Sequence, residues 1–403
     1  MKIICVGGGP AGLYFAICAK LRQPRWEITV LEQTRPGAAL GWGFVFWDDL
    51  LDDLYRNDSV TAQQIKQAAI VWKGMEVHRQ DQTIYLGGYG YSLSRPVFLN
   101  ILCKRARDLG VDVSFQHTIT NVERLAFADL IVAADGANSA LRQLHQFPTE
   151  VLVGRNRYLW LGTDRVWDSF HFAFERTPSG WIWFYAYPYT AGGSTLQVEC
   201  TPETWRGLQL NTLCPEHTMR LLSEIFARHL NGHVFQNHRP GADQLSTWQQ
   251  FRTIRNHMWH RGNVVLLGDA AHTTHFSIGS GTKLALGDAI ALAEKLSQQE
   301  TSSTLSRVYL LTRALQAYQI ERQAALLPIS QAAWNSALWF EHAGEDLERS
   351  TPGFLYALLK RQGHYPLNWF LIVLASQVSV LRRLRRWIGI QRRKFHAARR
   401  IAS

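Results

Sequence analysis

The chain has 403 residues, of which 46% are hydrophobic and 19% charged, a balance typical of a globular protein rather than a disordered one. This length allows a large core and more than one domain. The formal net charge is +11, but residues 382–403 hold nine Lys and Arg and no acid, which leaves +2 for the rest. The positive charge therefore belongs to a C-terminal tail, and this distribution argues against a nucleic-acid-binding protein.

Five cysteines are scattered along the chain, without C-x-x-C or zinc-ligand spacing, at Cys5, Cys18, Cys103, Cys200 and Cys214. This set favours reduced thiols in a cytosolic setting and predicts no metal site. No signal peptide is expected, because residues 1–6 run directly into a glycine motif.

The glycine motif Gly7-x-Gly9-x-x-Gly12 lies between a predicted buried strand at residues 2–6 and an apolar helix at residues 13–21. In this context the first glycine makes the tight turn, the second lets the backbone approach a pyrophosphate, and the third lets the helix pack on the strand. Glu32 ends the next predicted strand, where a carboxylate binds a ribose hydroxyl. We therefore predict a bound adenine dinucleotide, against the alternative of a structural turn with a surface glutamate.

A second polar turn follows the predicted buried strand at residues 264–267, where Gly268-Asp269 breaks the strand. A loop with Gly279 and Gly281 then leads into a predicted helix at residues 282–290. The carboxylate can hold hydroxyl groups, and the helix N-terminus favours negative charge. This segment therefore predicts a binding place for a polar cofactor.

Two aromatic stretches leave alternatives open. Residues 41–47 (GWGFVFW) suit contact with a flat ring, although ordinary packing is the favoured interpretation. Alternation in residues 158–200 predicts antiparallel sheet. All odd positions from 181 to 189 are aromatic, so that face is either a core-facing sheet or the wall of a pocket for an aromatic ligand.

The C-terminal segment combines an apolar stretch with the basic run. Residues 362–381 contain no Asp, Glu, Lys or Arg, but several polar residues dilute them. Between the two membrane interpretations, a peripheral interfacial segment is favoured over a membrane span. A C-terminal helix packed on the protein, with a frayed basic end, is an equally weighted alternative.

Three motifs in this order resemble the single-component (class A) flavin aromatic hydroxylases of the p-hydroxybenzoate hydroxylase type. They are the N-terminal glycine motif, Asp135-Gly136 with Ser139 and Arg142, and the sequence GDAAH that begins at Gly268. The resemblance covers roughly residues 1–300. The stretches GGGPAGLYFA, GWGFVF, YLWLGTDRVWDSFHFAFE and GDAAHTTHFSIGSGTKLAL are similar to the branch with salicyloyl-CoA 5-hydroxylase, 2-aminobenzoyl-CoA monooxygenase and the violacein-pathway hydroxylase.

The resemblance implies FAD as the bound cofactor, NADPH or NADH as a transient electron donor, and O2 as co-substrate. It implies that the flavin C4a-hydroperoxide hydroxylates an activated aromatic ring. The residues implied in cofactor binding are Gly7, Gly9, Pro10, Ala11, Gly12, Glu32, Arg95, Asp135, Gly136, Arg142, Asp269, Gly279 and Gly281.

The resemblance also raises the pocket interpretation of the aromatic residues. It implies catalytic candidates at His275, Tyr185 and Tyr187, and a substrate pocket with Phe46, Trp47, Trp183 and Phe276. His275 can orient or deprotonate a phenol, although a satisfied loop histidine is the favoured alternative. The sequence departs from the branch at Tyr185 and Trp47, which weakens the transfer of a specific substrate but not of the reaction.

The expected fold is α/β, with a Rossmann-like FAD-binding domain, an inserted antiparallel-sheet substrate domain and C-terminal helices. The predicted boundaries are 1–157 with 252–300 for the FAD-binding domain, 158–251 joined by 76–94 for the substrate domain, 301–365 for helices, and 366–403 for the tail. The expected location is cytoplasmic, with peripheral contact at the inner face of the membrane through the tail as an option.

The expected partner is a small aromatic molecule, an aryl thioester on CoA or a carrier protein, or an indole-type intermediate, and not nucleic acid. A monomer and a dimer are both compatible with the sequence. Two rival functions stay open: a non-oxygenating flavoprotein that shields an intermediate, and a flavin halogenase. The halogenase is the weaker rival, because Trp181-Ile182-Trp183 lacks the Ile-Pro that completes that motif.

Overall fold

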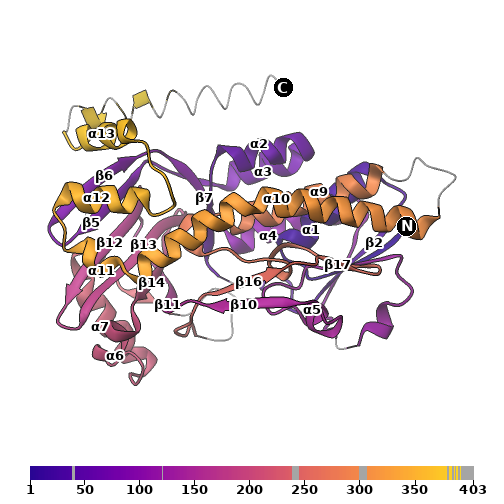
Figure 1. The fold of residues 1–403 in the computed structure, drawn as a ribbon, viewed down its shortest axis with the longest axis horizontal. Helices are drawn as coiled ribbons and strands as arrows, with labels where there is room; N and C mark the ends of the chain where they lie inside the picture. Colours follow the sequence, from indigo (N-terminus) through magenta and orange to yellow (C-terminus); the bar gives the residue numbers. More distant parts are fainter. Residues whose placement is uncertain are drawn as a thin grey trace.

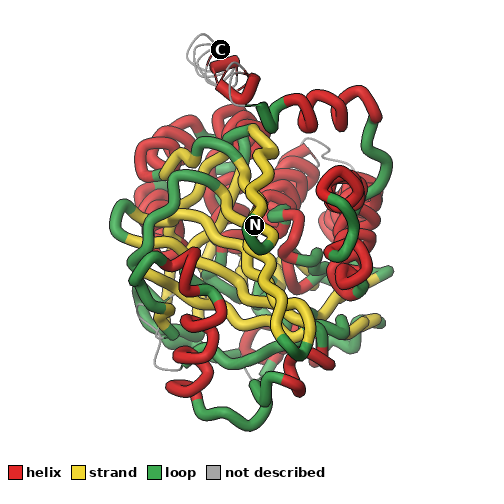
Figure 2. The backbone as a smooth tube through the Cα atoms, turned by 90° about the vertical axis from the view of Figure 1, so that its left-hand side faces the viewer, coloured by secondary structure: helices red, strands yellow, loops and turns green. Residues whose placement is uncertain are grey.

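The computed structural model describes residues 1–38, 41–119, 121–237, 245–298 and 306–378, with 381–383, 385, 387, 388 and 391 in addition. Its strands gather in the middle of the molecule and its helices lie mainly on the outside (Figures 1 and 2). Two large sheets and one long helix organise this arrangement and position the candidate site.

The first large sheet has six strands and contains the N-terminus. Its order is β17 (His260–Arg261), β18 (Val264–Leu266), β9 (Leu130–Ala133), β1 (Lys2–Val6), β2 (Glu27–Glu32) and β8 (Asp112–Phe115). All pairs are parallel except β17 with β18. The short apolar strands are buried because helices cover the parallel sheet.

Three helices accompany this sheet: α1 (Pro10–Arg22), α4 (Arg95–Asp108) and α9 (Gly281–Gln298). Helix α1 packs against both α4 and α9, and it is buried along almost its whole length. This placement explains why residues 11–19 are apolar or small on every face rather than on one stripe. The Rossmann-like α/β fold class is confirmed.

A smaller antiparallel sheet lies beside the first one. It contains β3 (Gly43–Phe46), β7 (Gly90–Ser94) and β4 (Ile70–Trp72). Helices α2 (Asp48–Asn57) and α3 (Ser59–Ala68) connect β3 to β4. Strand β7 also contacts the second large sheet, so this small sheet bridges the two.

The second large sheet has seven strands. Its order is β15 (Phe235–Gln236), β11 (Arg157–Thr163), β14 (Gly193–Cys200), β13 (Gly180–Thr190), β12 (Phe170–Thr177), β5 (Met75–Arg79) and β6 (Gln82–Gly87). Every pair is antiparallel except β12 with β5. The alternation in this part of the sequence therefore predicted the correct kind of sheet.

Different helices pack on the two faces of this sheet. On one face Ile182 and Phe184 pack with residues of α7 (Pro215–Ile225) and α8 (Ala227–Leu230), near α6 (Pro202–Gly207). On the other face Trp183 and Tyr185 pack with residues of α10 (Arg307–Glu341), α11 (Ala343–Leu347) and α12 (Thr351–Lys360). The period of two along β13 therefore separates two hydrophobic clusters.

Helix α10 joins the two halves of the molecule. It packs on α9 near the first sheet and runs on to the second sheet (Figure 1). Near its end, Phe340 stacks on Trp183 of the second sheet. Strands β10 (Thr149–Val153) and β16 (Arg252–Asn256) pair with each other where the chain enters and leaves the second sheet. The predicted domain boundaries near these strands remain a prediction.

The remaining elements are short. They are α5 (Ala140–Leu144), α13 (Leu367–Ala375), and the 3-10 turns Val122–Leu125, Gly268–Ala270 and Phe276–Ile278. Helix α13 lies on β6, where Val373 is buried and the Gln377 side chain bonds both backbone groups of Tyr85. None of the helices in the described part of the chain is both long and apolar enough to cross a membrane.

Candidate active site

The glycine loop after β1 contains glycines that the protein packs against and one that borders open space. A Cβ on Gly7, whose φ is +112°, would lie 2.2 Å from the carbonyl oxygen of Ala134, and a Cβ on Gly12 would lie 2.1 Å from that of Gly7. A Cβ on Gly9 would meet nothing within 4 Å. The protein therefore requires Gly7 and Gly12 for its own packing, whereas the space beside Gly9 fits the approach of a ligand.

Glu32 lies at this loop, as the spacing predicts. Its Oε2 accepts a hydrogen bond from the Gly8 N–H (2.7 Å), and its Oε1 accepts two from Thr34 (2.8 Å each). Pro10 occupies the first position of α1, where its missing N–H is harmless, and Ala11 follows it. The carboxylate is thus fixed next to the N-terminus of α1.

The turn after β9 is held by hydrogen bonds. Asp135 accepts bonds from a hydroxyl and an amide at the start of α5, and Gly136 takes a φ of +78°. Arg142 donates to the carbonyl oxygens of Ala137 (2.7 Å) and Ala270 (2.9 Å). The arginine therefore ties this turn to the turn after β18, and a cofactor contact for it stays a prediction.

Asp269 and Arg95 lie close enough for their charges to act on each other, and we refer to the region around these two side chains as the recess. The Asp269 side chain is exposed, yet surrounding protein raises the pKa of its carboxyl group. Burial lowers the pKa of the Arg95 guanidinium, and the nearby Tyr187 and Asp269 oppose this shift. The Asp269 carboxylate is thus accessible to solvent and close to a cationic side chain.

The residues around this recess fit FAD. The Nε of Arg95 is buried and has no hydrogen-bond partner among the described residues, although buried donors are nearly always paired. Open space lies beside Gly9 at the N-terminus of α1. A diphosphate would neutralise the guanidinium, and ribityl hydroxyls would suit the Asp269 carboxylate.

The loop before α9 passes close to the first aromatic stretch. Gly279 has a φ of +65°, and a Cβ there would lie 3.0 Å from Val45 and 3.2 Å from the Trp47 ring. A Cβ on Gly281 would meet nothing within 4 Å. Trp47 also packs edge-on against Trp72, with ring centroids 6.1 Å apart. Gly279 therefore permits an approach between this loop and Trp47 that a side chain would block.

The aromatic face of β13 is largely a core face. Trp183 stacks on Phe340 of α10 with ring centroids 5.8 Å apart, and Tyr185 meets the same ring edge-on at 5.1 Å. Trp181 belongs to the same buried cluster. Of the two alternatives left open, packing accounts for these three side chains, and a pocket role for Trp183 and Tyr185 remains a prediction.

Tyr187 and Phe46 lie at different places. Tyr187 donates a hydrogen bond to the carbonyl oxygen of Gly43 (3.1 Å), and its hydroxyl acts on the pKa of Arg95, so it lies near the recess. Phe46 stacks on Tyr91 with centroids 5.3 Å apart and belongs to the core of the first sheet. Packing explains Phe46, and its pocket role stays a prediction.

Glu199 is a candidate that sequence reasoning missed. This residue of β14 is 1% exposed, and its carboxylate accepts hydrogen bonds from the Tyr185 hydroxyl (2.5 Å), Trp183 Nε1 (3.2 Å) and Asn156 Nδ2 (2.7 Å). Burial raises its pKa to about 7. The available signal was a single acid within the otherwise uncharged strand GSTLQVEC.

His275 is a well-bonded loop residue. Its Nδ1 accepts a hydrogen bond from the Ser277 N–H (3.3 Å) and lies 2.9 Å from the Ser277 hydroxyl. Burial lowers its pKa to about 3, so the ring is neutral and a weak base at physiological pH. These contacts support the alternative of a satisfied loop histidine, and a catalytic role stays a prediction.

A small cavity lies between Glu199, His275 and Phe276. Its volume is about 10 Å³, which is room for about one water molecule. Phe276 closes it by packing on Tyr158 (4.9 Å between centroids) and Tyr185 (5.8 Å). An aromatic ring could enter only if the loop that carries Phe276 moved.

A larger cleft of about 320 Å³ lies between β16, residues 272–275 and α10. His275 lines both the cleft and the small cavity. The cleft has the size of a ligand pocket and mixes apolar residues such as Leu326 and Trp334 with polar ones such as Arg255.

Together, the fold and the recess define an α/β enzyme that binds a dinucleotide cofactor at the carboxyl ends of parallel strands. A family model described as FAD binding domain matches residues 101–324, a range that begins after the glycine loop.

Several known proteins are similar to the chain. Salicyloyl-CoA 5-hydroxylase of a Streptomyces species is 35% identical over 355 residues, which cover 85% of this chain and 66% of that protein. 3-Hydroxy-4-methyl-anthranilyl-[aryl-carrier protein] 5-monooxygenase of Streptosporangium sibiricum is 34% identical over 84% of this chain and 89% of its own. Protodeoxyviolaceinate monooxygenase of Chromobacterium violaceum is 29% identical over 91% and 96% of the two chains.

Solved structures share the fold. The tetrameric form of 2-methyl-3-hydroxypyridine-5-carboxylic acid oxygenase matches with a TM-score of 0.68 at 22% identity, over 90% of this chain and 96% of that chain. p-Nitrophenol 4-monooxygenase from Pseudomonas putida matches with a TM-score of 0.69 at 17% identity, over 93% and 97%.

The chain belongs to the class A FAD-dependent monooxygenases. The expected enzyme class, fold and FAD cofactor are confirmed, and NAD(P)H and O2 are the co-substrates typical of this family.

Proposed function

We propose that this monooxygenase hydroxylates an aromatic ring that is presented as a thioester of CoA or of a carrier protein. In the balanced reaction, the substrate, O2, NAD(P)H and one proton give the hydroxylated ring, water and NAD(P)+. Bound FAD supplies the redox chemistry of hydride acceptance and oxygen activation. The chain itself must bind, orient and protect the reactants.

One observation carries the thioester proposal: two relatives above 30% identity, which each match more than four fifths of this chain, are named for a CoA-linked and a carrier-protein-linked aromatic substrate. The cleft between β16 and α10 supports it, because His275 forms a wall common to the cleft and the small cavity. A pantetheine arm in the cleft would thus bring its aromatic end to the loop that carries Phe276.

The proposed roles of the chain follow from its contacts. Arg95 and Asp269 bind the polar parts of the cofactor, and Gly9 leaves room for its diphosphate. Phe276 and Tyr158 close the small cavity and shield it from bulk solvent, which limits side reactions with water.

The proposed route for a proton is the pair Tyr185 and Glu199. A ring hydroxyl or amino group next to Tyr185 would give its proton to the tyrosine oxygen while the tyrosine proton passes to Glu199. Glu199 suits this task better than His275, because a base works best when its pKa lies near the working pH, and the two pKa values are about 7 and about 3.

A panel of substrates tests the thioester proposal. We expect aryl-CoA thioesters to stimulate NAD(P)H oxidation with formation of hydroxylated product, and the matching free acids to stimulate it at least ~10-fold less, since remote binding energy contributes to catalysis. Ala337→Trp, which fills the cleft, should raise the KM for the thioester more than for a free acid. Mass spectrometry of the product and initial rates are the measurements.

The control is Ala324→Trp, an exposed position of α10 outside the cleft, which should leave both KM values unchanged. Equal stimulation by free acids and thioesters would reject the thioester proposal. Stimulation by indoles alone would move the substrate class toward that of the violacein-pathway relative. Flavin reduction without oxygen incorporation would favour a non-oxygenating flavoprotein.

We also propose peripheral contact of the C-terminal segment with an anionic lipid surface. Helix α13 exposes Leu367, Trp369, Leu371 and Ile372 while Val373 anchors it on the sheet. The basic run 382–403 follows after residues 376–381, although most of it lies outside the described residues. Apolar side chains with neighbouring cations are the combination that anionic membranes attract.

Removal of residues 382–403 should lower co-sedimentation with vesicles that contain phosphatidylglycerol, because about 1 kcal/mol of attraction per basic residue is lost near the surface. Vesicles of phosphatidylcholine alone serve as the control and should bind both forms weakly. Equal sedimentation of both forms with anionic vesicles would reject this contact. The monomer or dimer predicted from the sequence stays a prediction.

A further inference from the structure

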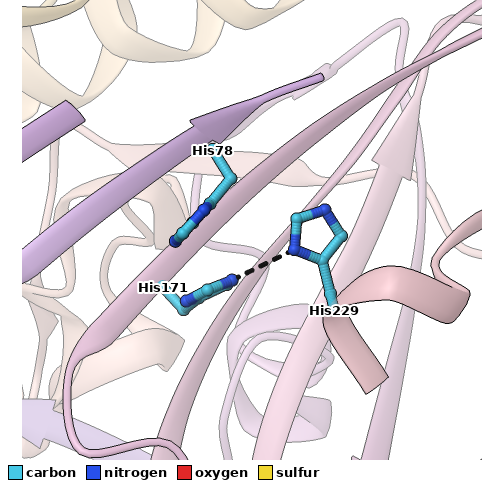
Figure 3. Close-up of side chains that lie close together, drawn as sticks. All are labelled: His78, His171 and His229. Carbon is cyan, nitrogen blue, oxygen red and sulfur yellow. Dashed lines mark hydrogen bonds between the residues drawn. The ribbon is translucent and has the colours of Figure 1, made fainter. Parts of the chain in front are cut away.

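Three histidines from distant parts of the sequence meet on the second large sheet. His78 comes from β5, His171 from β12 and His229 from α8 (Figure 3). One ring nitrogen of each lies within 4.8 Å of the other two. His171 is 6% and His229 7% exposed, and His78 is partly buried. The cluster lies under α8, among Trp167 and Phe184, and not at the recess near Arg95.

Hydrogen bonds fix the lone pair of one imidazole toward the cluster. His229 Nε2 lies 2.6 Å from Glu175 Oε1, a contact that requires a proton on this nitrogen. Arg228 Nε also lies 3.2 Å from Nε2, but it donates to the same carboxylate at 2.6 Å. The Nδ1 of His229 is therefore the acceptor nitrogen, and it faces His171.

The spacing of this first pair matches that of two ligands on one ion. His171 Nε2 and His229 Nδ1 are 3.3 Å apart and share the hydrogen bond drawn in Figure 3; an ion bound by both nitrogens would replace this bond, with the His171 proton moved to its Nδ1. Two imidazole nitrogens bound tetrahedrally at ~2.0–2.1 Å are separated by about 3.3–3.4 Å. The carboxylate on the far side of His229 repeats the carboxylate–histidine–metal arrangement that orients metal-binding imidazoles.

An unpaired buried nitrogen is the independent sign of a missing ligand. The Nε2 of His78 is buried and has no hydrogen-bond partner among the described residues, whereas the unpaired Nδ1 of His171 is not the nitrogen that faces His229. Glu76 comes no closer than 3.7 Å to the His78 nitrogen, and Thr83 bonds its other nitrogen at 3.0 Å. Polar atoms this buried are nearly always satisfied, so an unmet ligand is a direct explanation.

The protonation of two of the three rings also suits metal coordination. Burial, together with the charges of His78, His229 and Arg165, lowers the pKa of His171 well below its usual range. Burial likewise lowers the pKa of His229, against the opposing effect of Glu175. Both shifts favour the neutral form of these two rings, which is the form that binds metal ions.

We propose that His78, His171 and His229 bind a divalent transition-metal ion of the Zn²⁺ class. Three imidazoles without a thiolate select borderline ions rather than Ca²⁺ or Mg²⁺. Binding draws the less buried His78 ring, now stacked 4.0 Å from His171, toward the ion. The ion links α8 to β5 and β12. Sequence spacing predicted no metal site, because these ligands are too far apart to form a motif.

Zinc binding to the full-length, FAD-loaded protein tests this site. After treatment with a chelator, calorimetric titration with ZnCl2 should show one equivalent bound, and Zn²⁺ should raise the thermal midpoint. His171→Gln and His229→Gln should abolish stoichiometric binding. Glu175→Gln should weaken the affinity by ~10–100-fold, because it removes the carboxylate behind His229.

The matched control is His233→Gln, since this partly exposed histidine follows α8 and pairs with Asp164 outside the cluster. It should bind Zn²⁺ as the wild type does. His78→Gln changes the least buried ligand, so it keeps the test decisive if the other variants fail to hold FAD. Absence of stoichiometric binding in the wild type, or unchanged binding by His78→Gln, would overturn the proposal.

Discussion

Replacement of Gly9 by glutamate should give a folded protein that retains almost no FAD. The space beside Gly9 is free of protein atoms, so the fold does not exclude the new side chain. The φ of −76° at this position is also compatible with any residue. The glutamate would fill the place of the diphosphate and add a negative charge next to it, at the end of a helix that otherwise favours the cofactor.

The measurement is the ratio of flavin absorbance at 450 nm to protein, together with far-ultraviolet circular dichroism. Gly192→Glu is the matched control, because Gly192 lies in an exposed hairpin and also has open space around it. Gly12→Ala should instead damage the fold, since its Cβ would lie 2.1 Å from a backbone oxygen. A stoichiometric flavin content in Gly9→Glu would contradict this assignment.

Replacement of Glu199 by glutamine should lower kcat for the preferred aromatic substrate by about 100-fold, the lower range of general-base effects. The glutamine can keep the neighbouring hydrogen bonds. Its oxygen can accept from Tyr185 and Trp183, and the unpaired Oδ1 of Asn156 can accept from its amide after an amide flip. The lost property is therefore proton acceptance rather than packing.

The pH dependence separates proton transfer from packing. Glu199 accepts a proton only when ionised, so wild-type activity should be present above pH 7 and fall as the pH drops through about 7. The activities of Glu199→Gln and Tyr185→Phe should both lack this decrease at acidic pH. Glu348→Gln, which removes an exposed carboxylate bonded to Trp181, should retain it. If Glu199→Gln keeps the same decrease at acidic pH, Glu199 has only a structural role.

As the pH rises, the free energy of unfolding should decrease while the activity increases. The pKa of Glu199 is raised from 4.5 to about 7, so the folded protein holds a proton that the unfolded chain releases between these values. The free energy of unfolding of the wild type should therefore decrease by about 3 kcal/mol between pH 4.5 and 7 through this group. Urea unfolding at pH 5 and pH 8 should show that Glu199→Gln lacks this contribution.

Local motifs could be predicted from the sequence because their geometry is set over a few residues. The strand at residues 2–6, the glycine turn and helix α1 are contiguous, and the spacing to Glu32 reflects one helix and one strand. Alternation likewise predicted the antiparallel sheet, since a period of two follows from strand geometry alone. The adenine dinucleotide therefore came from local motifs, whereas FAD and the complete fold class came from the resemblance that the motifs carry.

Only the tertiary structure shows which elements pack on each face of β13. The alternation shows that Trp183 and Tyr185 share a face with Tyr187, but it cannot tell which element packs there. Helix α10 places Phe340 on Trp183 and Tyr185, whereas Tyr187 lies beyond it and reaches Gly43. One face of a single strand thus serves both core packing and the neighbourhood of the recess.

Long-range pairs were equally invisible to the sequence. The register of β13 and β14 sets Trp183 opposite Glu199, and only this pairing turns a single buried acid into a hydrogen-bonded group with a raised pKa. In the same way, the charge of Asp269, which is distant in sequence, acts on the pKa of Arg95 only because folding brings the two side chains together. The sequence by itself determined the cofactor class through short-range geometry, whereas desolvation and charge proximity, which set the chemistry of each side chain, depend on contacts that only folding creates.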